Sequence, residues 1–244
     1  MARKYAKKNN KMKKRGGRKP RVVYRNKPLG PLFPQEQIAK HRFSATVDLV
    51  CDYTSADQLT TNSFRFISPY TLHNPLAGPE GVGPVMFYDQ MKAHYQKYQV
   101  LGAKVRVKFI NKSSAPVFIG IFRNTTTPTS GWKLTSIRER GFKKQKMLGA
   151  LNTGREVGNM TETYSLKKAL GQNKLQIEAN SSTYMTIDDD TVNQDAVTQF
   201  IVFYAAPVDS TLNPSTNLPV ECQIDYQCIA RWMDRDRLGD SESA

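Results

Sequence analysis

The chain has 244 residues, with 36 Lys and Arg against 21 Asp and Glu, and a formal net charge of +15. Residues 1–27 hold 13 of the cations and no acid, so residues 28–244 carry 23 cations and 21 acids, or +2. This distribution argues against a protein whose basic charge is spread over a folded binding face. The odd number of cysteines, three, argues against a complete disulfide framework.

The first 27 residues form a basic arm. Like charges repel and few apolar residues are available to bury, so we expect the arm to be disordered in isolation. A polyanion orders such a segment, because each cation that neutralises a phosphate releases a condensed counterion. We predict that nucleic acid binds the arm cations; a nuclear localisation signal and a solubilising tail are the alternatives. These cations are Arg3, Lys4, Lys7, Lys8, Lys11, Lys13, Lys14, Arg15, Arg18, Lys19, Arg21, Arg25 and Lys27.

Three prolines separate the arm from the rest of the chain. Pro28, Pro31 and Pro34 fall within seven residues and prevent regular pairing, so residues 28–37 are expected to be an extended connector. We place one folded domain at 38–234 and a polar tail at 235–244. The arm's charges are not followed by the apolar core of a secretory signal, and the longest apolar runs are too short to span a bilayer. We therefore expect no membrane insertion.

The domain is predicted to consist of strands separated by loops. Apolar and polar residues alternate with a period of two over 41–53, 100–111 and 220–233, which is typical of strands with one buried face. Segments 116–123 and 197–206 are apolar on both faces and suit central strands. Shorter strands are expected at 63–67, 175–179 and 183–187, a short helix within 85–98, and a strand with one helical turn closed by Gly171 over 162–171.

About eight strands and no long helices indicate an all-β protein, either an antiparallel sandwich or a barrel. A single eight-stranded jelly-roll β-sandwich fits this pattern, because it pairs the first and last strands of the domain within one architecture. The order of the strands in the sheets is not determined by the sequence.

The search for catalytic chemistry is negative. His41, His73 and His94 have no metal-ligand spacing, and no catalytic or phosphate-binding motif is present. Cys51, Cys222 and Cys228 are interpreted as reduced thiols packed mainly in the core. We predict no enzyme, no cofactor and no metal. The run Asp188, Asp189 and Asp190 could help to bind a divalent cation, but neighbours in a strand point to opposite faces, which favours a solvated loop.

Two further basic segments have two interpretations each. Lys104, Arg106 and Lys108 share the polar face of a predicted strand, where they either contact nucleic acid or form an ordinary solvated face. Arg138, Arg140, Lys143, Lys144 and Lys146 either bind a polyanion or form a charged surface loop. Tyr95 and Tyr98 either stack on bases or pack in the core, and packing is the favoured interpretation.

Residues 95–111 read Tyr-Gln-Lys-Tyr-Gln-Val-Leu-Gly-Ala-Lys-Val-Arg-Val-Lys-Phe-Ile-Asn. They resemble a segment of the capsid proteins of circovirus-like viruses, which are small circular single-stranded DNA viruses of the Rep-encoding CRESS-DNA group. Tyr-Ser-Leu-Lys-Lys-Ala-Leu-Gly at 164–171 and the closing strand around Ile224 and Tyr226 also look like that group. The resemblance covers most of the chain in layout and these segments in residue detail. This arm is richer in lysine than typical circovirus arms, which leaves charge neutralisation intact but puts detailed phosphate geometry in doubt.

The resemblance implies a jelly-roll subunit of an icosahedral shell, with sixty copies in the simplest, T=1, arrangement. It also implies an inward-facing arm that packages circular single-stranded DNA and doubles as a nuclear localisation signal. A nuclear import receptor and a host-cell attachment factor are then expected partners, and the virion and the host nucleus the expected locations. The alternatives are a coat protein of a small RNA virus, a cellular nucleic-acid-binding protein and a glycan-binding jelly roll.

Overall fold

The structure is a computed structural model that describes residues 36–55, 58–77, 83–125, 132–139, 143–171, 173, 176, 185–186, 199–208 and 218–235. By its internal contacts the chain divides into Met1–Phe33 and Pro34–Ala244. The arm cations, Asp188–Asp190 and the residues after Arg235 lie outside the described residues, so the predictions for them remain predictions.

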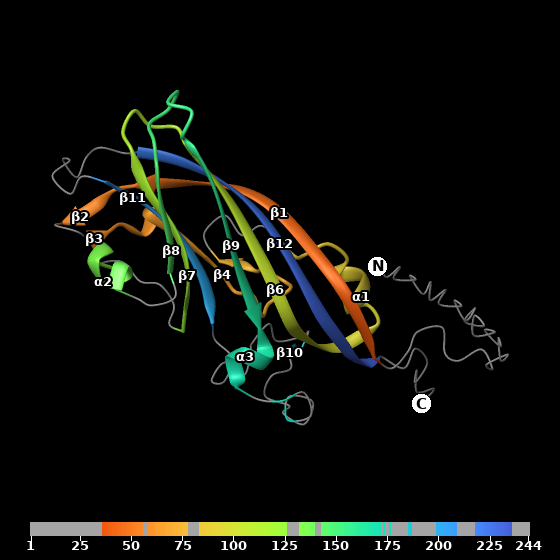
Figure 1. Cartoon of the computed structure of the whole chain (residues 1–244). Helices are drawn as coiled ribbons and strands as arrows, with labels where there is room; N and C mark the ends of the chain where they lie inside the picture. Colours follow the sequence, from red (N-terminus) through yellow and green to blue (C-terminus); the bar gives the residue numbers. More distant parts are fainter. Residues whose placement is uncertain are drawn as a thin grey trace, which may run out of the picture. The chain divides into compact units, whose positions relative to one another are not determined.

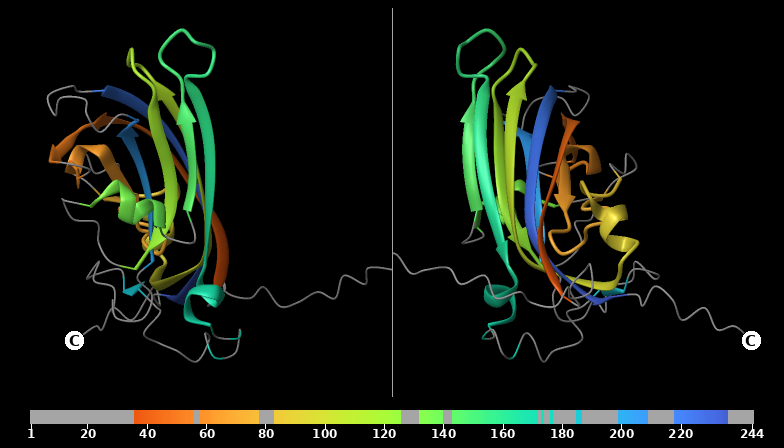
Figure 2. Two further views of the ribbon diagram at one scale, coloured as in Figure 1. Left: turned by 60° about the vertical axis from the view of Figure 1, so that its left-hand side comes forward. Right: turned by 90° about the vertical axis from the view of Figure 1, so that its right-hand side faces the viewer.

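The described residues form two main antiparallel sheets, which Figures 1 and 2 show packed face to face. Sheet I runs in the order β1 (Gln37–Cys51), β12 (Leu218–Arg235), β6 (Tyr95–Asn111) and β9 (Val157–Ser165), and β10 (Met185–Thr186) also pairs with β6. Sheet II runs in the order β5 (Leu76–Ala77), β4 (Phe64–Ile67), β11 (Phe200–Pro207), β7 (Val117–Asn124) and β8 (Lys143–Leu148). A small hairpin joins β2 (Tyr53–Ser55) to β3 (Gln58–Leu59).

The connectivity is that of a jelly roll. Sheet I contains the strands β1, β12, β6 and β9, sheet II contains β4, β11, β7 and β8, and most connections cross from one sheet to the other. The first strand, β1, pairs over its full length with the last strand, β12, from Gln37 opposite Trp232 to Cys51 opposite Leu218. The predicted fold class, an antiparallel jelly-roll β-sandwich, is therefore confirmed.

The strands follow their predicted periodicities. In β1 the residues Val47, Leu49 and Cys51 are buried while the residues between them are more exposed, and β12 alternates in the same way. Strand β11 is buried at every position. The boundaries differ from the prediction by a few residues, most at β6, which begins at Tyr95 because its first residues pair with the end of β12 beyond a register shift at Ile229 and Ala230. The helix expected within 85–98 is confined to α1 (Tyr88–Lys92).

Two other short helices lie on the sandwich. The predicted turn after β9 is α3 (Leu166–Leu170), and Gly171 closes it with a φ of +64°. The basic segment 138–146 is not one surface loop, as one interpretation had it: Arg138 lies in α2 (Leu134–Glu139) and Lys143–Lys146 lie in β8. Helix α2 forms there because Leu134 and Ile137, three residues apart, bury the same face.

The outer face of sheet II is covered. The ring of Trp132 stacks on Phe64 with centroids 5.8 Å apart and lies 5.7 Å from Phe122. The ring of Tyr204 covers Gly120, where an added Cβ would come within 2.2 Å of the Tyr204 side chain. This second apolar layer explains why β7 and β11 are apolar on both faces.

Candidate nucleic-acid interface

The outer face of sheet I is open and basic. The residues that alternate with the core positions of β1, β12, β6 and β9 lie side by side in rows across the four strands. One row is Ser44, Asp225, Arg106 and Thr161. The neighbouring rows are Thr46, Gln223, Lys108 and Asn159 on one side, and Arg42, Gln227, Lys104 and Thr163 on the other. With Lys40, which lies opposite Ile229, we call these residues the basic face.

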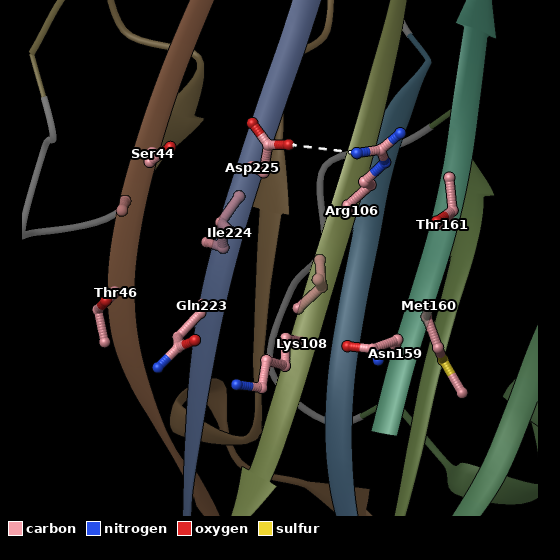
Figure 3. A pocket seen from close by; sticks show the side chains of 12 residues that line it. Ser44, Thr46, Arg106, Lys108, Asn159, Met160, Thr161, Gln223, Ile224 and Asp225 are labelled. Carbon is pink, nitrogen blue, oxygen red and sulfur yellow. Dashed lines mark ion pairs between the residues drawn. The ribbon is translucent and has the colours of Figure 1, made fainter. Parts of the chain in front are cut away.

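The charge of the basic face is strongly one-sided. Five of its side chains are cations and one, Asp225, is an acid. The Asp225 carboxylate lies 3.7 Å from the Arg42 guanidinium and 3.8 Å from that of Arg106, the second pair being marked in Figure 3. Exposed ion pairs of this kind contribute about 0–1 kcal/mol to stability. Their main effect here is to orient two guanidinium groups on a surface that keeps an excess of positive charge.

The basic face carries two hollows. The first, of about 550 Å³, is lined by Arg106 and Lys108 together with hydroxyl and amide side chains such as Thr46, Asn159 and Gln223, which Figure 3 shows on four adjacent strands. The second, of about 450 Å³, lies around Lys40, Arg42, Lys104 and Thr163. The lining of the first hollow includes no aromatic side chain. Cations with neutral hydrogen-bonding groups suit phosphate and sugar contacts rather than base stacking.

Two acids at the ends of sheet I, Glu36 and Glu221, have their own partners. Arg231 holds Glu36 through two nitrogens, with the closest approach at 2.7 Å. At the other end Lys112 lies 2.5 Å from Glu221, and this contact raises the pKa of the Lys112 ammonium and lowers the pKa of the Glu221 carboxyl. The exposed Asp48, which lies opposite Glu221 beside the last row of the basic face, and Asp225 are therefore the acids next to its five cations, and a positive excess remains.

The structure brings the predicted residues Lys104, Arg106 and Lys108 onto one exposed face, as their spacing indicated. Whether they bind nucleic acid remains a prediction. Sequence reasoning missed Lys40 and Arg42, which lie on the same face because β12 places β1 in register with β6. The alternation over 41–53 had already put Arg42 on a polar face, but only the strand order joins that face to β6.

Tyr95 and Tyr98 belong to the core. Each is 1% exposed, and their rings lie 6.3 and 5.2 Å from that of Trp232. The Tyr98 hydroxyl accepts a hydrogen bond from the Leu72 backbone N–H at 3.2 Å. The favoured interpretation, core packing, is confirmed, and base stacking by these two rings is wrong.

The second basic segment is partly used inside the fold. The Arg138 guanidinium lies over the Phe118 ring, 4.4 Å from its centroid. The Lys144 ammonium lies 2.9 Å from the Glu162 carboxylate and also donates a hydrogen bond to the Thr161 carbonyl. Arg140 and the side chain of Lys143 lie outside the described residues, and Lys146 is exposed. In the described residues this segment therefore offers fewer uncommitted cations than its sequence implied.

The three cysteines are free and buried. Burial raises the pKa of all three thiols, that of Cys228 to about 12, so they stay protonated near neutral pH. The described residues hold no cluster of three or more His, Cys, Asp or Glu side chains suited to a metal ion. None of the helices in the described part of the chain has the length and apolar character needed to cross a membrane.

No protein-family model and no curated protein matches this chain. Solved structures of virus particles superpose on it. Macrobrachium rosenbergii nodavirus is 11% identical over 95% of this chain and 93% of that chain, with a TM-score of 0.45. Mud crab tombus-like virus is 12% identical over 94% of each chain, with a TM-score of 0.44. Desmodium yellow mottle tymovirus is 10% identical over 89% of this chain and 100% of that chain, with a TM-score of 0.40. At these identities the likeness concerns the fold alone.

Proposed function

We propose that this protein is a viral capsid protein, in which the jelly-roll domain tiles a closed shell and the basic arm binds the packaged nucleic acid. The observation that carries the proposal is the arm itself: 13 cations without an acid precede a jelly-roll domain. Jelly rolls also serve as lectin and cupin domains, so the fold alone does not define the function. A long acid-free arm has no role in sugar or metal binding, but it suits a polyanion enclosed by many copies.

The mechanism follows from charge and tethering. A packaged genome requires many cations at high local concentration and little sequence specificity, and an acid-free basic arm on every copy of the domain would supply both. Sixty copies would bring about 780 arm cations together, enough for about 780 phosphates. The tiles must also present self-complementary edges, because a symmetric shell repeats the same contacts.

The basic face is the second part of the proposal. Lys104, Arg106 and Lys108, joined by Lys40 and Arg42, would contact the phosphate backbone from the inner side of the shell. The arm and the basic face hold their cations in separate parts of the sequence, so their contributions to binding are separable by mutation.

The type of nucleic acid is the finer question. The resemblance of residues 95–111 implies circular single-stranded DNA. The nodavirus, the tombus-like virus and the tymovirus named above are RNA viruses. Charge neutralisation does not distinguish DNA from RNA, so a coat protein that packages RNA is the alternative. A nuclear import receptor for the arm and a host attachment factor belong to the DNA-virus form of the proposal.

The first experiment measures the mass of the full-length protein by light scattering, with the ratio of absorbance at nucleic-acid and protein wavelengths. We expect a particle in the megadalton range that contains nucleic acid, and digestion of the extracted cargo by DNase or RNase identifies it. A 27.6 kDa monomer that persists when nucleic acid is added back over a range of salt and pH would overturn the capsid proposal. That outcome would favour a cellular nucleic-acid-binding protein.

The second experiment separates the arm from the face. Deletion of residues 1–27 should abolish most nucleic-acid binding and leave the fold intact. The triple change of Lys104, Arg106 and Lys108 to Gln should lower the slope of log affinity against log salt by about 2, at about 0.7 per lost single-strand phosphate contact. The matched control changes the exposed Lys92, Lys133 and Lys168 to Gln, and should leave the slope near that of the wild type. Equal effects of the two triple changes would contradict a role for the basic face.

A further inference from the structure

His41 is a buried histidine in the aromatic part of the core. It lies on β1 with 1% of its surface exposed, and its ring centroid is 5.6 Å from that of Trp232. The Trp232 ring is in turn surrounded by Tyr88, Tyr95 and Tyr98 at 5.2–6.3 Å. The imidazole therefore has little access to water.

Both ring nitrogens of His41 have partners that define its protonation state. The Trp232 indole Nε1–H donates to His41 Nε2 at 2.9 Å, and an indole N–H can only donate, so Nε2 carries no proton. His41 Nδ1 lies 3.0 Å from the Met86 carbonyl oxygen, which can only accept, so Nδ1 carries the proton. The geometry requires the neutral imidazole in a single tautomer.

The His41 side chain thereby fastens the segment Gly83–Lys92, which includes α1, to the edge of sheet I. A second bond, from the Met86 N–H to the Arg42 carbonyl at 2.9 Å, joins the same segment to β1. Met86 and Phe87 are 60% and 51% exposed, and Phe87 has a φ of +68°, a left-handed conformation that is unfavourable for a bulky residue. Such a strained residue persists only where surrounding contacts hold it.

Protonation of Nε2 would point its new N–H at the Trp232 N–H, so one hydrogen bond would be replaced by two opposed donors. The titratable groups around this bond are Cys228, opposite His41 on β12, and Tyr88, Tyr95 and Tyr98 around the Trp232 ring; the His73 ring lies 5.6 Å from that of Tyr88, and none of these groups is a carboxylate. Lys40 and Arg42 flank it on β1 with their side chains on the opposite face. Of the acids on the adjoining segments, Glu36 is paired with Arg231 and Asp89 is exposed.

We propose that His41 is an acid-sensitive joint: protonation of its Nε2 breaks the bond to Trp232 and releases the segment Gly83–Lys92 from β1. Opening would expose the rings around Trp232 and relax the backbone at Phe87. The joint is a property of the jelly-roll domain and does not depend on the proposed capsid function.

The direction of the pH dependence follows from the burial of the imidazole. Burial lowers the pKa of His41 from its usual 6.5, and the bond to Met86 partly opposes that shift. The opened segment leaves His41 in water with an ordinary pKa, so the open state binds the proton more readily. The closed joint is therefore fully stable above about pH 6.5 and loses stability as the pH falls from there through the lowered pKa.

The experiment follows hydrogen exchange by mass spectrometry on the full-length protein over a pH series, with exchange corrected for its intrinsic pH dependence. Peptides covering Gly83–Lys92 should lose protection below pH 6.5, in step with the titration of His41 measured by exchange at its ring carbon. The chain has only three histidines and two tryptophans, so each signal is assignable. In a Trp132→Phe background the emission of Trp232 should shift to the red over the same range.

His41→Gln keeps a neutral donor and acceptor at this position, and we expect it to remove the acid transition. His73→Gln removes the other imidazole that contacts this segment, with its ring 5.6 Å from that of Tyr88, and should retain the transition. Two results would overturn the proposal: His41 titrates while the segment stays protected, or His41→Gln opens at the same pH as the wild type. The first comparison uses only the wild-type chain, so it remains decisive if the variant does not fold.

Discussion

The outer faces of the two sheets differ although both sheets contribute to the same core. The outer face of sheet II is apolar and is covered by Trp132 and α2, whereas the outer face of sheet I is polar, basic and open among the described residues. The difference lies in the strand sequences: β6 alternates Lys and Arg with apolar residues, while β7 and β11 are apolar throughout most of their length. Because Trp132 and α2 cover the outer face of sheet II, the outer face of sheet I is the one available to a partner.

The largest effect on stability is expected when a charge is placed on the core face of β6. Val107→Asp places a charge in the core, because Val107 is 1% exposed, and we expect a loss of about 4 kcal/mol or more of the free energy of unfolding. Arg106→Asp, one residue away on the basic face, should fold and should weaken nucleic-acid binding. Denaturant unfolding measures the stability of both variants, and a salt titration measures nucleic-acid binding by Arg106→Asp. An assembly-competent Val107→Asp protein would show that the assignment of the core face is mistaken.

A smaller effect is expected on the covered face of sheet II. Trp132→Ala removes the ring that packs on Phe64 and Phe122, and because this ring is only partly buried we expect a loss of about 2–3 kcal/mol. Met147→Ala, at an exposed position of the same sheet, is the control and should stay within about 0.5 kcal/mol of the wild type. If both variants unfold at the same denaturant concentration, Trp132 does not support the covering layer.

The third effect concerns the junction of the two sheets. Glu162 is 8% exposed and accepts contacts from Arg123 at 3.3 Å and Lys144 at 2.9 Å, which links β9 of sheet I to β7 and β8 of sheet II. Glu162→Gln should cost about 1–2 kcal/mol, since both cations are partly exposed and can be hydrated instead. Glu139→Gln at an exposed acid is the control, and thermal unfolding of the two variants tests the difference.

The smallest effect on stability is expected on the open face of sheet I. Lys104→Gln should change the free energy of unfolding by less than about 0.5 kcal/mol, because the half-buried Lys104 side chain has no ion pair with another described residue. The same change should lower the salt slope of nucleic-acid binding by about 0.7. A large loss of stability with an unchanged salt slope would show that Lys104 supports the fold and does not bind nucleic acid. The outer face of sheet I would then not differ from that of sheet II in the way described.

The sequence by itself determined the main strands, because a period of two in β1, β6 and β12 specifies which side of each strand is buried. It also determined the separation of charge, because 13 cations without an acid cannot form a packed core. Gly171 was predictable as a helix end for an equally local reason, the left-handed conformation that glycine readily adopts.

Only the tertiary structure decided which strands are neighbours. Lys40 and Arg42 are more than 60 residues from Lys104, and they share its face because β12 lies between β1 and β6 in register with both. Tyr95 and Tyr98 are core residues because Trp232, near the other end of the domain, packs against them. His41 acquires its bonded partners in the same way, from Met86 and Trp232. Local periodicity fixes the direction in which a side chain points, whereas its neighbours depend on pairings between distant segments, which a single sequence does not reveal.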